Sequence, residues 1–293
     1  MQMVTHPTIC GHNEDGCALA PGMAGVAWKI TDREHSEALA EELSELRREH
    51  DELRRTVFEA AQMQRRLCGP RHVRRGSYTL AGELFPVQHV SGDFLTVFEQ
   101  ESRLIFALGD IAGKGLAAGM WFTHMVGLIR MSISGKEPAD GMSAINRELC
   151  CAEFAPPLTS LFLASLDQES DEITYCNAGH PPSLIVRRPG TVESLHIGGP
   201  ILGAVPEAPY SAARIQLQAG DSLLSFSDGI MECRNSLGAE FGTERLILAA
   251  KSAPDSSATD KLFTLLGAVE DFVSPGQRED DFALLLLHRN FSD

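Results

Sequence analysis

Residues 31–69 carry an apolar pattern with the period of a paired helix. Seam positions recur in steps of four and three, at Leu39, Leu43, Leu46, His50, Leu53, Val57 and Ala60. A period of about 3.5 residues keeps one seam facing a partner helix, and Gly69 followed by Pro70 marks the end. The flanking positions are heavily charged, which favours a coiled coil over a single amphipathic helix lying on its own domain. We therefore expect a parallel homodimer formed through residues 34–67.

Beyond Pro70 the pattern changes to short apolar runs of strand length. These runs are Tyr78–Phe85, Phe94–Phe98, Leu104–Leu108, Leu161–Leu166, Ile173–Cys176, Leu184–Val186, Leu223–Phe226 and Phe282–Leu287. Short strands linked by turns and interrupted by pairs of helices are typical of the α+β class with antiparallel sheets. We expect one such domain over residues 70–293.

Helical patterns separate these runs, at 114–133, 141–154, 243–252 and 257–273. The first is apolar nearly all round, so we expect it to be deeply buried. The last has an apolar face and begins with Ser257 and Asp260, which fit a capping box. Residues 1–30 are rich in glycine and small side chains without periodicity, and we expect a flexible leader. Cys10, His12 and Cys17 in this leader lack a fourth ligand, which favours a leader without a metal.

Composition and charge narrow the range of partners and locations that the protein can have. Of 293 residues, 43% are hydrophobic and 22% charged, as in an ordinary globular protein. The formal charge of -15 repels phosphate backbones and anionic lipids, which disfavours nucleic acid and membrane partners. The seven cysteines show no paired spacing, and no apolar run approaches the roughly 20 residues that span a bilayer. We expect a cytoplasmic protein with reduced thiols.

Aspartates fall at the ends of the expected strands. Asp110 and Asp228 follow strands, whereas Asp93 and the pair Asp280 and Asp281 precede them. The start of one antiparallel strand lies beside the end of the next, so these acids can gather at one edge of the sheets. The hairpin over 94–109 by itself brings Asp93 close to Asp110.

Gathered carboxylates predict a bound cation, because like charges otherwise raise one another's pKa. Oxygen ligands without nearby cysteine or histidine favour Mg²⁺ or Mn²⁺ over zinc, and the carbonyl of Ile111 can complete the ligand shell. The alternative is that each aspartate only makes a turn, as Asp-Gly commonly does. Four acids in this arrangement favour a metal site.

Five short motifs follow one another along the chain. They are Ser91-Gly92-Asp93-Phe94, Gly109-Asp110-Ile111-Ala112-Gly113-Lys114-Gly115, Asn177-Ala178-Gly179-His180-Pro181-Pro182, Ser227-Asp228-Gly229-Ile230-Met231-Glu232 and Asp280-Asp281. In this order they resemble bacterial PPM-type serine/threonine phosphatases of the SpoIIE/RsbU kind. The resemblance spans Val57 to Arg289. It implies an α-β-β-α sandwich of two antiparallel sheets, with two Mn²⁺ or Mg²⁺ ions at one edge that activate a water for direct hydrolysis of a phosphoester.

The resemblance also implies roles for individual acids. Asp110 would bridge the two metals, Asp228 and Asp280 would hold one of them, and Asp93 would act directly or through water. Asp281 falls where the family often has another Asp or Asn, and we expect it to support the site without ligating a metal.

Some positions depart from the family or leave alternatives open. Ser91 stands where glycine is usual, a change that we expect to be tolerated. Ala112 replaces the histidine proposed as general acid in the eukaryotic branch, and His89 is a candidate for that role. We expect a structural hydrogen bond for His180 in its proline-rich turn. Lys114 either contacts phosphate or begins a helix with its ammonium group in solvent.

The resemblance implies a physiological role in partner switching. Similar phosphatases act on phosphorylated STAS-domain antagonists of anti-sigma factors, and we expect a substrate of that kind. Residues 60–67 match a linker helix that similar phosphatases use as a switch. The alternative is a catalytically silent phosphatase-fold module that dimerises through its helix and sequesters a signalling partner. A metal-dependent nuclease would need a basic groove beside the acids, which the sequence lacks.

Overall fold

The computed structural model describes residues 21–87, 89–153, 156–188, 190–254, 257–274 and 280–291, with side chains from residue 35 onward. The chain forms two compact units, residues 1–55 and residues 56–293. Helix α1 (Pro21–Leu67) supplies the described part of the first unit and the beginning of the second.

Helix α1 begins earlier than the sequence pattern predicts. The expected leader reached residue 30, but the chain is helical from Pro21. Proline suits a first helical position because its fixed φ is helical and its missing N–H is not needed there. The cysteines and histidine of residues 10–17 lie outside the described residues.

Most seam positions of α1 are exposed in the single chain, whereas Val57 and Ala60 are half-buried. The exposed seam leucines are Leu39, Leu43, Leu46 and Leu53. The side chain of His50 is exposed as well. Homodimerisation through this seam stays a prediction.

Two sheets form the centre of the second unit. The first sheet has the order β1 (His72–Arg75), β2 (Tyr78–Phe85), β12 (Phe282–Arg289), β11 (Ser222–Phe226), β7 (Ser183–Val186) and β8 (Val192–Leu195). The second sheet has the order β10 (Ala213–Ile215), β6 (Ile173–Ala178), β5 (Thr159–Asp167), β4 (Arg103–Ile111) and β3 (Asp93–Gln100), with β9 (Gly198–Gly199) beside β6. Neighbouring strands pair antiparallel apart from the short β6–β9 pair.

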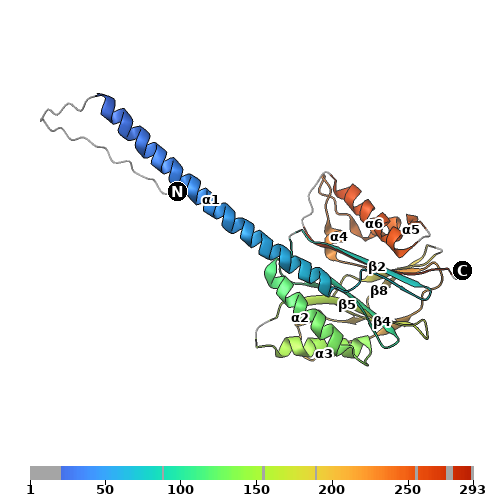
Figure 1. Cartoon of the computed structure of the whole chain (residues 1–293). Helices are drawn as coiled ribbons and strands as arrows, with labels where there is room; N and C mark the ends of the chain where they lie inside the picture. The colour runs from blue at the N-terminus through green and yellow to red at the C-terminus, as the bar shows by residue number, and fades with distance from the viewer. Residues whose placement is uncertain are drawn as a thin grey trace. The chain divides into compact units, whose positions relative to one another are not determined.

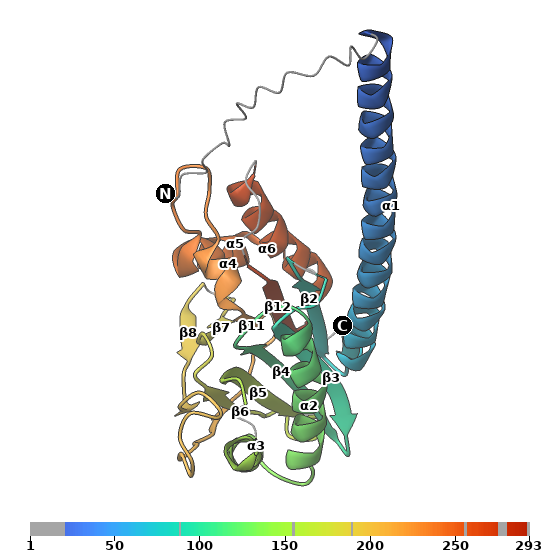
Figure 2. The ribbon, with the colours of Figure 1, turned by 90° about the vertical axis from the view of Figure 1, so that its left-hand side faces the viewer.

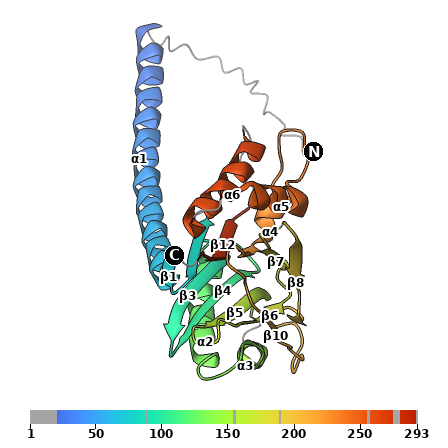
Figure 3. The ribbon, with the colours of Figure 1, turned by 90° about the vertical axis from the view of Figure 1, so that its right-hand side faces the viewer.

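Helices cover the outer face of each sheet. Helices α2 (Leu116–Ser132) and α3 (Pro138–Cys151) pack on the second sheet, and α5 (Gly242–Ser252) and α6 (Ala258–Val273) pack on the first. Figures 1, 2 and 3 show these four layers, with α2 and α3 below the strands and α5 and α6 above them. The expected α-β-β-α sandwich is confirmed. A short helix, α4 (Asp228–Glu232), follows β11 directly.

The core holds the two sheets together from both sides. Its largest fully buried side chains include Phe94, Phe106, Phe122, Phe162 and Phe226. Burial of one such side chain contributes about 1.5–3 kcal/mol to the free energy of folding. The core therefore stabilises the strands whose ends carry the aspartates. The capping box at α6 is confirmed, because Ser257 Oγ accepts a hydrogen bond from the Asp260 N–H at 3.2 Å.

Helix α2 corrects one expectation from the sequence. Only one of its faces is buried, and Leu116, Met120 and Met131 are exposed on the other. A helix that packs on one side of a sheet has no further layer above it, so an apolar circumference does not guarantee burial. Within the described residues, no helix combines the length and the apolarity needed to cross a membrane.

Candidate metal centre

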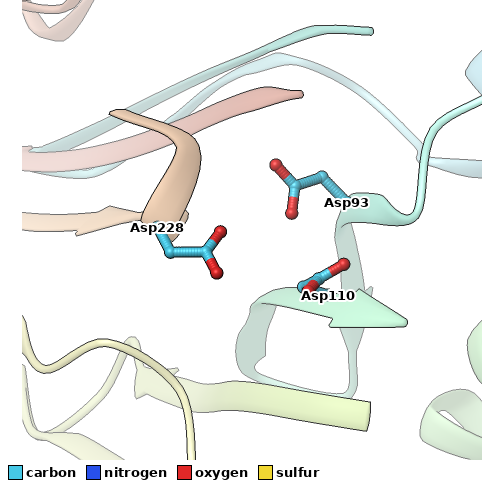
Figure 4. Close-up of side chains that lie close together, drawn as sticks. All are labelled: Asp93, Asp110 and Asp228. Carbon is cyan, nitrogen blue, oxygen red and sulfur yellow. The ribbon is translucent and has the colours of Figure 1, made fainter. Parts of the chain in front are cut away.

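Three aspartates converge at one edge of the sandwich. Asp93 on β3 and Asp110 on β4 lie directly opposite each other in the hairpin register, as the sequence predicts, so their side chains share one face of the second sheet. Asp228 arrives from the first sheet, as the first residue of α4 after β11. One carboxylate oxygen from each of the three lies within 4.8 Å of the others. Figure 4 shows the three side chains pointing into a common space.

Burial and the repulsion of like charges outweigh the favourable contacts of the carboxylates in this cluster. Burial, and then the charge of Asp110, raises the pKa of Asp93 well above its ordinary value. Burial and the charge of Asp228 raise the pKa of Asp110 to about 6. The Oδ2 atom of Asp93 is buried and has no hydrogen-bond partner within the described residues. A buried carboxylate oxygen without a donor, beside two further carboxylates, fits a hard divalent cation.

Two glycines let the backbone approach the acids. A Cβ atom on Gly92 would lie 2.8 Å from the Ile111 carbonyl oxygen and 3.1 Å from Asp110 Oδ1. A Cβ atom on Gly229 would clash with the Asp281 carbonyl oxygen. Side chains do not fit at these positions. The Ile111 carbonyl oxygen and Asp110 Oδ1 both lie close to Gly92, and the role of Ile111 as a metal ligand stays a prediction.

Asp280 lies outside the three-aspartate cluster. Its Oδ1 atom is 2.8 Å from Lys114 Nζ, and both side chains are about half exposed. The same oxygen accepts a hydrogen bond from the Asp281 N–H at 3.0 Å. The hydrogen bond to Asp280 raises the pKa of Lys114. Lys114 therefore neutralises an acid next to the cluster, a contact that the sequence does not predict.

Asp281 holds the loop in front of the cluster. Its carboxylate accepts hydrogen bonds from the Val87 N–H at 2.7 Å, the Ser91 hydroxyl at 2.6 Å and the Gly92 N–H at 3.2 Å. These contacts use both oxygens and fix the turn that leads into Asp93. The hydroxyl of Ser91 has a specific partner, which the sequence analysis missed when it treated this residue only as a tolerated replacement for glycine.

Helix α1 reaches the same turn through Gln64. Its Nε2 donates a hydrogen bond to the Ser91 carbonyl at 2.8 Å, and its Oε1 accepts one from the Ser91 N–H at 3.2 Å. The Val97 N–H also donates to the Cys68 carbonyl at 3.0 Å, which joins the end of α1 to β3. Gln64 was not singled out from the sequence. The available signal was an uncharged polar side chain at the next position of the four-and-three spacing after Ala60, where the seam pattern calls for an apolar one.

The two histidines near the motifs differ in their surroundings. His89 is exposed in the loop before β3. His180 is buried, and its Nδ1 is hydrogen-bonded to Ser160 Oγ at 2.8 Å. Burial lowers the pKa of His180 to about 3. These contacts agree with the structural hydrogen bond expected for His180.

The chain is similar in sequence to one protein family and to several characterised proteins. A model of the family described as Stage II sporulation protein E (SpoIIE) matches residues 100–290. The phosphoserine phosphatase RsbU of Bacillus subtilis (strain 168) is 24% identical over 248 residues, which are 83% of this chain and 73% of RsbU. The phosphoserine phosphatase RsbP of the same organism is 24% identical over 205 residues, which are 68% of this chain and 49% of RsbP.

A solved structure shares the architecture. The SiaA-PP2C domain of Pseudomonas aeruginosa matches with a TM-score of 0.70 at 15% identity, covering 83% of this chain and 98% of that one. At this level of identity the likeness concerns the fold, and it agrees with the sandwich described above.

Proposed function

This chain belongs to the SpoIIE family, and from that membership we propose that it hydrolyses phosphoserine or phosphothreonine on a regulatory protein with two divalent metal ions. The family match and the phosphoserine phosphatase relatives confirm the expected enzyme class, a phosphoprotein phosphatase. The observation that carries the metal dependence is the cluster of Asp93, Asp110 and Asp228, with the unpartnered buried oxygen of Asp93.

The residues present fit a pair of divalent cations, Mn²⁺ or Mg²⁺. From the resemblance of its motif we assign to Asp110 the role of the ligand that would be shared by both ions; one of its carboxylate oxygens lies within 4.8 Å of those of Asp93 and Asp228. The Ile111 carbonyl and Asp280 complete the proposed ligand set. When bound, the ions supply positive charge for the phosphoryl oxygens and a water of lowered pKa.

The chain itself orients these groups. Asp281 fixes the turn before Asp93 through three hydrogen bonds, and Gly92 and Gly229 allow the backbone to close around the acids. Lys114 forms an ion pair with Asp280, and its side chain is about half exposed, so an incoming phosphate can contact it. Water is the nucleophile in this scheme, so hydrolysis requires no covalent phosphoenzyme.

The proposed substrate is a phosphorylated STAS-domain antagonist of an anti-sigma factor in a partner-switching pathway. Support comes from the relatives named phosphoserine phosphatases and from the resemblance of the motifs. The proposed enzyme is a homodimer through residues 34–67, where exposed leucines form one row.

The test is phosphate release from a panel of phosphorylated STAS-domain proteins, with Mn²⁺, with Mg²⁺ and with EDTA. We expect metal-dependent release from at least one member, and no release by the Asp110→Asn variant. Mn²⁺ binding without release from any phosphoprotein or from p-nitrophenyl phosphate would contradict the proposal and favour the silent module that sequesters a partner.

A further inference from the structure

The chain crosses from one sheet to the other at the metal edge. Strand β6 belongs to the second sheet and ends at Ala178, which pairs with Leu161 near the start of β5. Strand β7 belongs to the first sheet and begins at Ser183, next to Leu184, which pairs with Leu224 on β11. The crossover of residues 179–182 therefore lies at the edge where β4 and β11 end, which is the edge of the three aspartates.

His180 sits in this crossover with contacts toward both sheets. Toward the second sheet, its Nδ1 is hydrogen-bonded to Ser160 Oγ at 2.8 Å. Ser160 lies directly opposite Asp110 in the β4–β5 register, so the two side chains are neighbours on one face of the sheet. Toward the first sheet, the crossover leads directly into β7, whose Leu184 pairs with Leu224 on β11, and the imidazole lies near the backbone of Phe226, two residues before Asp228.

The crossover backbone is held in place by Asn177. Its Oδ1 accepts a hydrogen bond from the His180 N–H at 2.8 Å, and its Nδ2 donates to the His180 carbonyl at 3.0 Å. The imidazole is therefore anchored at its backbone and at Nδ1. Its Nε2 atom is buried and has no hydrogen bond of normal geometry among the described residues, so this side chain is kept at a cost in free energy.

A buried side chain retained with an unpaired polar atom is often a functional feature. The metal edge gives His180 such a function. Asp110 and Asp228 come from different sheets, and their separation must stay fixed if both are to bind the metal. Face-to-face sheets are joined by interdigitating side chains and not by a ladder of backbone hydrogen bonds. A metal site tolerates displacements of only about 0.5 Å.

We propose that His180 is a positioning residue that couples the two sheets at the metal edge and thereby sets the separation of Asp110 and Asp228. The inference rests on the proposed metal-dependent function. The imidazole acts through Ser160 on one side and the end of β11 on the other, and it touches neither substrate nor metal.

The chain contains a matched control. His288 on β12 is also buried, and its Nδ1 is hydrogen-bonded to Ser222 Oγ at 3.0 Å. Ser222 is the first residue of β11, at the opposite end of that strand from Asp228. His288 thus has the same kind of histidine–serine pair within one sheet and away from the metal edge.

The experiment compares His180→Asn with His288→Asn in the full chain. Titration calorimetry with Mn²⁺ alone measures metal affinity, and thermal unfolding in EDTA measures the structural cost of each variant. Loss of a group that orients metal ligands typically weakens metal binding by roughly 10- to 100-fold, and we expect that loss for His180→Asn. For His288→Asn we expect an Mn²⁺ affinity close to that of wild type, even if its Tm falls as much as the Tm of His180→Asn. Equal weakening in both variants, or in neither, would overturn the inference.

A second variant covers the case in which His180→Asn does not fold. Ser160→Ala removes the same hydrogen bond with a smaller change, and we expect weaker Mn²⁺ binding in the same direction. The wild-type chain separates the two hypotheses. If wild type neither binds Mn²⁺ nor releases phosphate, the proposed function fails and this inference with it. If wild type does both and Ser160→Ala binds Mn²⁺ as tightly, the inference alone fails.

Discussion

Replacing Asp110 with asparagine is expected to stabilise the metal-free protein while it abolishes turnover. The carboxylate of Asp110 is held next to Asp93 and Asp228. Its pKa is raised to about 6, first by burial and then by the charges of Asp228, Asp280 and Asp281. Asparagine has nearly the same shape and no charge. The substitution therefore removes an electrostatic cost of folding and also removes the proposed bridging ligand.

The size of this effect follows from the pKa. A shift from the ordinary 3.8 to about 6 corresponds to about 3 kcal/mol at 1.36 kcal/mol per unit. The shift is upward, so the folded state holds the proton more tightly than the unfolded state. Below pH 3.8 the carboxyl is protonated in both states and costs no folding free energy. As the pH rises from 3.8 through about 6, the folded state loses the proton that it held more tightly, and the free energy of unfolding falls.

Urea unfolding in EDTA at pH 4 and at pH 7.5 measures this difference. We expect Asp110→Asn to exceed wild type by up to about 3 kcal/mol at the higher pH and to approach wild type at the lower one. Mn²⁺ should stabilise wild type and leave the variant unchanged.

Asp167→Asn is the control of opposite sign. Backbone hydrogen bonds from Ser170 and Glu169 lower the pKa of Asp167, so its charge favours the fold and its loss should destabilise slightly. A metal-free Asp110→Asn variant no more stable than wild type at pH 7.5 would refute the claim that uncompensated charge is concentrated at this edge.

Three further predictions concern the remaining acids and helix α1. Asp280→Asn should lose most phosphate release, whereas Asp281→Asn should lose less activity but lower the Tm, because the carboxylate of Asp281 holds the turn before Asp93; equal activity losses would contradict the separation of ligand from support. Gln64→Leu should weaken Mn²⁺ binding in calorimetry through its contacts with the turn, and Gln62→Leu should not; identical affinities would make Gln64 a passive contact. Full-length protein should be dimeric by light scattering at tens of micromolar and a chain starting at Gly69 monomeric; a full-length monomer would exclude the coiled coil.

Local pattern was sufficient for the elements that build the core. All eight apolar runs correspond to strands, because a buried strand must be apolar over most of its length. The strands β1, β8, β9 and β10 were missed. His72–Arg75 and Val192–Leu195 carry charged side chains toward solvent and show no apolar run. Gly198–Gly199 and Ala213–Ile215 are only two and three residues long. The five-residue helix α4 is too short to display a period.

The site was predictable to the extent that strand pairing determines it. The hairpin register that sets Asp93 opposite Asp110 follows from the sequence, because two apolar runs joined by a short turn must pair in this way. The approach of Asp228 depends on how two sheets pack, which periodicity does not encode. The ion pair of Lys114 with Asp280 and the contact of Gln64 with Ser91 are likewise products of tertiary packing.

The metal edge concentrates the polar contacts that a repelling cluster requires. Three acids at close range, of which Asp93 is buried, Asp110 partly buried and Asp228 exposed, would separate if their supports were free to move, because their carboxylates repel one another and gain solvation by moving apart. Each acid is therefore tied to a different part of the fold: Asp93 through the turn held by Asp281 and Gln64, Asp110 through its place inside β4, and Asp228 through the end of β11. The free energy of core packing offsets the repulsion between the carboxylates. The fold holds their oxygens at positions where a bound cation would cancel this repulsion. Metal binding and local rigidity at this edge should consequently rise and fall together, because both depend on the same supports.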